Sequence, residues 1–123
     1  MLRMTIAEFH EAMKAQGVKR HEDFAFKCPI CNTVQSGQTL LNAGAAPTWD
    51  EVERFVGFSC VGRFTDAGPY KKRNKPGRGC DWTLGGFFKL HELEVVDADG
   101  KAHPRFVLAS PEEAAQLALA GKP

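Results

Sequence analysis

The segment Phe26-Lys27-Cys28-Pro29-Ile30-Cys31 is the part of this sequence that decides its expected fold. Two cysteines separated by two residues can turn both thiolates toward one tetrahedral metal ion, at sulfur–metal distances of about 2.3 Å. Cys60 and Cys80 are the remaining cysteines, with 19 residues between them. If the intervening stretch is an insertion between adjacent strands, this second pair can complete the shell. We therefore expect the four cysteines to hold one structural Zn²⁺.

A redox pair is the main alternative use of Cys28 and Cys31. In thiol oxidoreductases such a motif begins a helix, which lowers the pKa of the first thiol. Here the motif continues as Asn32-Thr33-Val34-Gln35, which is a poor helix start, and the other two cysteines would have no role. A thiol oxidoreductase is therefore the third-ranked function for this chain.

Other metal sites are also weighed against four cysteines. A histidine in place of one cysteine gives a second ligand set, and the histidines considered for it are His21, His91 and His103. An iron–sulfur cluster is less favoured because its usual cysteine spacings are absent. Four thiolates leave no open position for water, and no His-Glu-x-x-His pattern is present. We therefore expect a structural metal and no enzymatic activity.

Composition places the chain among small folded proteins of a reducing compartment. Its 123 residues are 43% hydrophobic and 25% charged, near the averages for one globular domain. No apolar run approaches the roughly 18–20 residues of a membrane span. The first residues lack the basic start and uninterrupted apolar stretch of a secretory signal. We expect a cytoplasmic protein without membrane contact, whose thiols stay reduced.

The order of the predicted elements indicates an α+β fold with a single zinc-stabilised domain over residues 1–123. A small, mainly antiparallel sheet would carry the zinc-ribbon-like four-cysteine site over about residues 24–90, followed by a C-terminal hairpin and helix over about 91–120. Capping motifs at Thr5-x-x-Glu8, Thr48-x-x-Glu51 and Ser110-Pro111 mark N-terminal, central and C-terminal helices. The expected helices cover 6–16, 36–43, 49–56 and 111–120. The expected strands cover 24–27, 58–60, 81–84 and 87–96, and Asp99-Gly100 predicts a hairpin that pairs 93–96 with 106–108.

Positive charge is concentrated in the middle of the chain. Residues 63–90 carry a net charge of +5, whereas residues 1–62 carry −1 and residues 91–123 carry −3. Residues 63–79 are rich in glycine and proline and predict a loop. Lysine and arginine gain free energy on phosphates by releasing counterions, and aromatic rings stack on bases. The residues expected to contact nucleic acid or another partner are Arg63, Tyr70, Lys71, Lys72, Arg73, Lys75, Arg78 and Trp82. A protein-binding loop and a merely solvated loop are the alternatives.

Two resemblances accompany these motifs. Residues 26–31 and the segment Gly79-Cys80-Asp81-Trp82 resemble zinc-ribbon and zinc-finger modules. In its length and in segments 58–63 and 82–86, the chain also resembles small accessory proteins of bacteriophages and prophages. That second resemblance implies DNA or RNA binding, or inhibition of a host or defence protein. The expected function is a non-enzymatic, zinc-stabilised protein that contacts nucleic acid through residues 63–82, and the alternative is a phage-type protein–protein inhibitor or adaptor.

Overall fold

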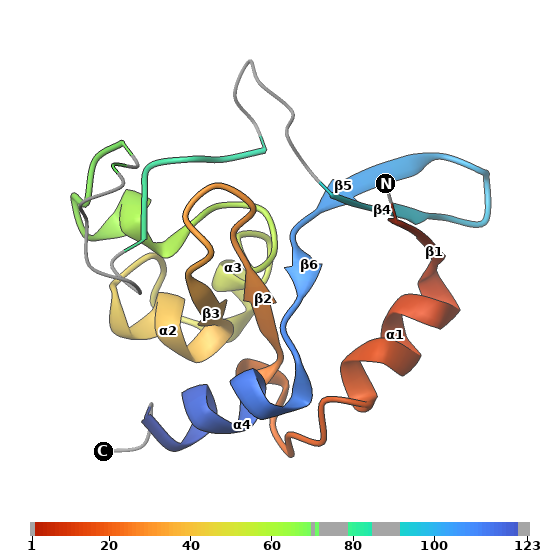
Figure 1. Cartoon of the computed structure of the whole chain (residues 1–123), viewed down its shortest axis with the longest axis horizontal. Coiled ribbons are helices and arrows are strands. Elements are labelled where there is room, and N and C mark those ends of the chain that lie inside the picture. Colours follow the sequence, from red (N-terminus) through yellow and green to blue (C-terminus); the bar gives the residue numbers. More distant parts are fainter. Residues whose placement is uncertain (1, 70, 72–78, 85–91, 121–123) are drawn as a thin grey trace.

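The computed structural model of the chain describes residues 2–69, 71, 79–84 and 92–120, which form four α-helices, two short 3₁₀ helices and two small sheets (Figure 1). The elements in chain order are β1 Leu2–Thr5, α1 Ile6–Lys14, η1 His21–Asp23, β2 Ala25–Lys27, β3 Val34–Ser36, α2 Gly37–Asn42, α3 Trp49–Val52, η2 Val61–Phe64, β4 Leu93–Val96, β5 Ala102–Arg105, β6 Val107–Leu108 and α4 Pro111–Ala120. The predicted α+β class is confirmed.

The strands form two three-stranded sheets where the sequence predicts one. Their orders are β1-β4-β5 and β3-β2-β6. Every pairing is antiparallel except that of β1 with β4. The chain passes from β5 through Phe106 into β6, and so links the two sheets (Figure 1). Strand β1 is absent from the sequence-based expectation, because its four residues precede a strong helix signal.

Capping motifs fix the two terminal helices as predicted. The Thr5 hydroxyl accepts a hydrogen bond from the Glu8 amide (3.1 Å), and the Thr5 amide donates to the Glu8 carboxylate (3.0 Å). Ser110 and Glu113 make the same reciprocal pair at the start of α4, at 3.1 and 3.0 Å. Each pair satisfies two amides that a helix start leaves without partners.

The central helix is shorter than predicted. α3 covers only Trp49–Val52, and the Thr48 side chain makes no capping hydrogen bond. The amides of Phe55 and Val56 donate to carbonyls three residues back, so the chain continues as tight turns. Gly57 then takes a left-handed conformation, with φ of 74°, and turns the chain toward Cys60. The strand predicted at 58–60 is reduced to one bridge, between Ser59 and Thr83.

The predicted C-terminal hairpin exists with a different partner strand. β4 pairs with β5 and not with 106–108. The Asp97 carboxylate closes the turn by accepting hydrogen bonds from the amides of Asp99 (3.0 Å) and Lys101 (2.9 Å). Because the turn is short, the strand that immediately follows it, β5, pairs with β4. Val107–Leu108 instead pairs with β2 in the other sheet. The strand residues predicted at 87–91 lie outside the described part.

The main core surrounds the cysteines. Cys28, Cys60 and Cys80 are fully buried together with Leu40, Val52 and Phe106. A smaller cluster of Ala25, Ala109 and Ala114 lies where β2 meets α4. The buried Gln16 joins these segments, because its amide donates to the carbonyls of Ala25 (2.8 Å) and Ala109 (3.0 Å). The fold is thus built around the thiols.

Candidate metal centre

A tight turn between β2 and β3 presents the first two cysteines. The Cys28 amide donates to the Thr33 carbonyl (3.0 Å), and the Asn32 amide donates to the Cys28 carbonyl (2.9 Å). Asn32 has a φ of 60°, the left-handed conformation that asparagine tolerates better than most residues. Cys28 and Cys31 therefore lie in a turn between two strands, and not at the start of a helix as in a redox motif.

Antiparallel contact between residues 58–60 and 82–84 presents the second pair. The Cys60 amide donates to the Trp82 carbonyl (3.0 Å), and the Leu84 amide donates to the Phe58 carbonyl (3.0 Å). This contact brings Cys60 close to Cys80 although 19 residues separate them in the sequence. The sequence-based idea that the basic stretch is an insertion between neighbouring segments agrees with this geometry.

The four sulfurs lie at distances suited to a shared metal ion. All four are within 4.8 Å of one another, with 3.8 Å between the Sγ atoms of Cys28 and Cys80 and 3.7 Å between those of Cys31 and Cys60. A disulfide would need about 2.05 Å. Tetrahedral sulfur–zinc bonds of about 2.3 Å place the sulfurs about 3.8 Å apart. The four cysteines can hold a metal ion, and their spacing fits zinc.

The four thiols strongly influence one another's pKa values. The pKa of Cys31 is lowered by the neighbouring thiols, Cys28 first, because their S–H groups can hydrogen-bond to a thiolate there. The pKa of Cys28 is raised far above its usual value, with the contact to Cys31 as the largest cause. The pKa of Cys60 is lowered as well, with the hydrogen bond from Cys28 as the largest cause. Four thiolates at this spacing need a positive ion between them.

Hydrogen bonds around the sulfurs complete the centre. The Cys80 amide donates to Cys60 Sγ (3.3 Å). Thr33 Oγ1 lies 3.1 Å from Cys31 Sγ and accepts a hydrogen bond from the Gly79 amide (3.0 Å). When Cys31 is a thiolate, the Thr33 hydroxyl proton can point at it. Such outer contacts orient metal ligands, and here they connect the two halves of the cluster.

The sequence matches one family of known proteins. Residues 5–109, which include all four cysteines, match the family described as VVA0879-like. The chain belongs to the VVA0879-like family. No curated protein and no solved structure matches it.

The predicted partner-binding residues of this VVA0879-like chain are only partly described. Arg63 lies in η2, where the sequence predicts a loop, and its side chain is exposed. Lys71 is exposed, and the ring of Trp82 stacks on Phe106 with 5.6 Å between centroids. The residues of this set that lie outside the described part are Tyr70, Lys72, Arg73, Lys75 and Arg78.

The histidines weighed as metal ligands are not in the four-cysteine cluster, as far as the structure describes them. His103 instead pairs with Asp97, with 2.9 Å between Nε2 and Oδ2. His21 stacks on Phe24, with 6.3 Å between ring centroids. His91 lies outside the described residues.

Among the described residues, no helix combines the length and apolar character that crossing a membrane requires.

Gln35 is a supporting residue that sequence reasoning misses in this VVA0879-like chain. Its side chain is fully buried, and its amide nitrogen donates to the Ser59 carbonyl (2.8 Å). Its amide oxygen accepts from the Val61 amide (2.7 Å). Gln35 therefore fixes both sides of Cys60 to β3. Gln35 stands between Val34 and Ser36, and glutamine is a residue type that is mostly exposed, so the sequence carries no signal for this role.

Replacement of Gln35 by leucine is expected to destabilise the metal-loaded protein by about 2–4 kcal/mol. The change leaves a buried carbonyl at Ser59 and a buried amide at Val61 without partners. Urea unfolding monitored by circular dichroism measures the loss. Gln116→Leu is the matched control, because Gln116 is an exposed residue of α4. Equal stability of the two variants would contradict the role of Gln35.

Proposed function

We propose that this chain is a non-enzymatic, zinc-stabilised binding protein that contacts nucleic acid through residues 63–82. The observation that carries the proposal is the position of Cys60 and Cys80. Both belong to the four-cysteine cluster, and they bracket the most basic stretch of the sequence. A metal at the cluster would hold both ends of that stretch in fixed positions.

Zinc is the ion that the donor set favours. Soft thiolate ligands in a tetrahedral arrangement select Zn²⁺ or iron–sulfur centres, and the four sulfurs lie close enough to share a single ion. Three of the four cysteines are fully buried. A closed, buried shell of four sulfurs offers no position for substrate or water, so the metal would supply stability and not catalysis.

The described parts of the basic segment support contact with phosphates. Arg63 and Lys71 are exposed. The guanidinium of Arg63, at the start of the segment, donates to the carbonyl of Asp81, near its end (2.8 Å). This hydrogen bond joins the two ends of the segment next to Cys80. Trp82 is only partly buried, and its stacking on Phe106 fixes its orientation. A guanidinium fixed at Asp81 and an oriented ring at the next residue suit a backbone-tracking nucleic-acid surface.

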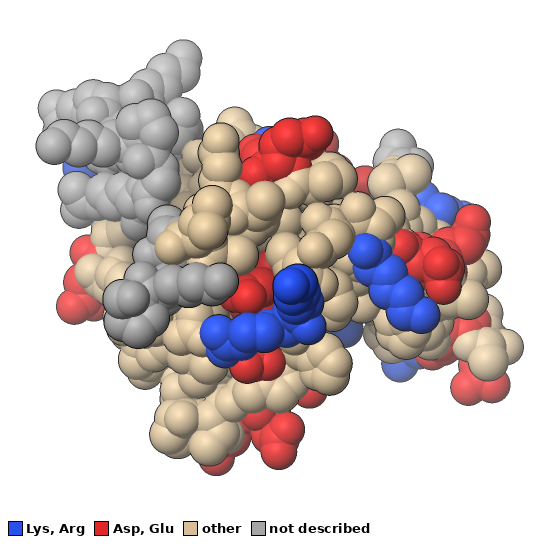
Figure 2. Space-filling view, turned by 90° about the horizontal axis from the view of Figure 1, so that it is seen from below, with Lys and Arg blue, Asp and Glu red and all other residues tan. Residues whose placement is uncertain are grey.

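Charge elsewhere on the molecule is mixed. On the face shown in Figure 2, basic side chains alternate with acidic ones over the described residues. Several basic side chains of the described residues are paired, as Lys27 is with Glu113 at 2.8 Å. This pairing holds the pKa of Glu113 below its usual value, mainly through the hydrogen bond from Lys27. That face therefore lacks the continuous positive surface of a general DNA-coating protein, which favours a local contact at residues 63–82.

A salt titration tests the nucleic-acid proposal. The zinc-loaded full chain is expected to bind short single- and double-stranded DNA or RNA at low salt. Alanine at Lys71, Lys72 and Arg73 should lower the slope of log affinity against log salt by about two to three. The control replaces Lys14, Lys19 and Lys101, which are exposed elsewhere. Absence of binding at low salt, or an equal loss in the control, would contradict the proposal.

A protein partner is the second candidate function, and it corresponds to the phage-type inhibitor or adaptor. An apolar groove of about 290 Å³ between α1, β4 and β6 favours it. Leu2 contributes to this groove and is 50% exposed. After nuclease treatment, a stoichiometric protein partner that is retained by the parent chain and lost with Leu2→Glu would favour this function over nucleic-acid contact.

A further inference from the structure

A second pocket lies between α1, η1, β2 and α3, and its walls are largely aromatic. Its volume is about 280 Å³, and the rings of Phe9, Phe24, Phe26 and Trp49 contribute to its lining. Phe9 and Phe26 contact each other, with 6.0 Å between centroids. The pocket is lined by none of the four cysteines and by no described residue of the 63–82 segment. The function proposed above leaves it without a role.

Two glycines fix the walls of this pocket. Trp49 packs so closely on Gly37 that a Cβ atom there would lie 2.8 Å from Trp49 Cε3 and closer still to Cζ3. A Cβ atom on Gly57 would lie 3.0 Å from Phe26 Cδ2. Both rings therefore lie directly against backbone, which restricts their movement. A preformed aromatic surface binds without the cost of ordering side chains.

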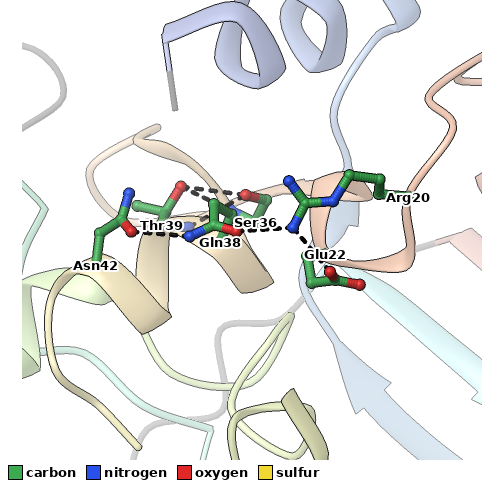
Figure 3. Close-up of polar contacts among 6 residues, drawn as sticks. All are labelled: Arg20, Glu22, Ser36, Gln38, Thr39 and Asn42. Atoms are coloured by element: carbon green, nitrogen blue, oxygen red, sulfur yellow. Dashed lines mark hydrogen bonds and ion pairs between the residues drawn. The ribbon is translucent and has the colours of Figure 1, made fainter. Parts of the chain in front are cut away.

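A polar network fastens η1 to α2 at one side of the pocket (Figure 3). Arg20 donates to the Glu22 carboxylate (2.8 Å) and to the Gln38 side chain (3.0 Å). Gln38 in turn donates to Asn42 (2.8 Å). The network holds the turn that carries His21 and Phe24, both of which line the pocket. In the same network, the Arg20 guanidinium is hydrogen-bonded to Glu22 and Gln38 at the surface.

The charge of the lining selects the chemistry of an occupant. Glu53 contributes a carboxylate, and His10 and His21 contribute rings. Among the described lining residues there is no lysine or arginine. The faces of aromatic rings carry negative charge density and attract cations, most strongly at tryptophan. An anion would meet no lysine or arginine among the described lining residues, whereas a cation with an apolar body would meet rings and the Glu53 side chain.

We propose that this pocket binds a small organic cation of the alkylammonium class, with the ammonium group against Trp49 and near Glu53. The proposal is independent of the metal and of nucleic-acid binding. The indole N–H resonance of Trp49 in the zinc-loaded full chain reports occupancy, and Trp82→Phe assigns the two indole signals. Choline is expected to shift the Trp49 signal saturably at millimolar concentration. The neutral isostere 3,3-dimethylbutan-1-ol should bind about fivefold more weakly or worse.

Two substitutions on α3 and the following turn complete the test. Glu53→Gln keeps the shape of the side chain and should weaken choline binding by about two- to fivefold. Glu51→Gln is the matched control, because Glu51 is an exposed neighbouring acid that does not line the pocket, and it should leave the affinity unchanged. A saturable shift that is weakened by both the isostere and Glu53→Gln supports the site. Equal affinity for the isostere, no effect of Glu53→Gln, or no saturable shift would overturn the proposal.

Discussion

Replacement of Cys28 by serine is expected to abolish the proposed zinc binding and to unfold the domain. Cys28 is fully buried, and its sulfur lies 3.8 Å from that of Cys80. Structural zinc supplies about 10–16 kcal/mol of binding free energy near pH 7. Small domains have a total stability of about 5–15 kcal/mol. The loss therefore exceeds what the remaining core can offset, and circular dichroism with a zinc assay measures both effects.

A pair of substitutions at Cys31 separates metal binding from packing. Cys31 is only partly buried, so its replacement disturbs the core less. Histidine can ligate zinc as the fourth ligand beside three cysteines, whereas serine ligates poorly. Cys31→His should retain zinc and fold, and Cys31→Ser should lose both. A Cys28→Ser protein that melts at the parent temperature would contradict a structural metal held by Cys28, and one that keeps its zinc would show that Cys28 is not a required ligand.

Local signals in the sequence account for the elements that were predicted correctly. The Thr5/Glu8 and Ser110/Glu113 motifs join residues three positions apart, so no distant part of the chain has to be known. The Cys28–Cys31 turn is equally local, because the two backbone hydrogen bonds that close it lie within six residues. Such features form from the chemistry of adjacent residues and survive in the folded structure.

Pairing between distant segments accounts for what the sequence did not reveal. β1 pairs with β4 in parallel, with Leu2 opposite Leu93, and four residues of alternating polarity carry too little information to indicate that partner. At Thr48 the capping motif is present in the sequence and its hydrogen bonds are not formed. There the ring of Trp49 packs on Gly37, and this tertiary contact coincides with a helix of one turn. Long-range packing outweighs a local preference of about 1 kcal/mol.

The candidate metal centre likewise has one part that the sequence predicts and another that depends on contacts between distant segments. Its four cysteines can be recognised from the sequence because thiols are rare and chemically specific. Its supporting contacts, such as Gln35 on the backbone around Cys60, depend on where a second segment passes. The aromatic pocket also needs the fold, since its rings come from residues as far apart as Phe9 and Trp49.

Replacement of Gly62 by alanine is expected to impair both folding and metal binding, although it adds one methyl group. Gly62 packs against the backbone that presents Cys80. A Cβ atom at Gly62 would lie 2.6 Å from the Cys80 carbonyl oxygen, 2.7 Å from the Gly79 carbonyl carbon, and closer still to the Cys80 amide nitrogen. Backbone atoms cannot rotate away as a side chain can, so the two cysteine-bearing segments must move apart. Overpacking of this kind costs about 1–3 kcal/mol, or roughly a 5- to 150-fold loss of zinc affinity when folding and binding are linked.

The visible spectrum of the Co²⁺-substituted protein distinguishes a displaced ligand from general destabilisation. Gly44→Ala is the matched control, because Gly44 has a φ of 79° and a Cβ atom there meets nothing within 4 Å. That variant carries only left-handed backbone strain of about 1–2 kcal/mol and adds no steric contact. We expect Gly62→Ala to alter the Co²⁺ spectrum and Gly44→Ala to preserve it. An unchanged spectrum and affinity in Gly62→Ala would mean that the close approach of residues 62 and 80 does not set the geometry of the metal centre.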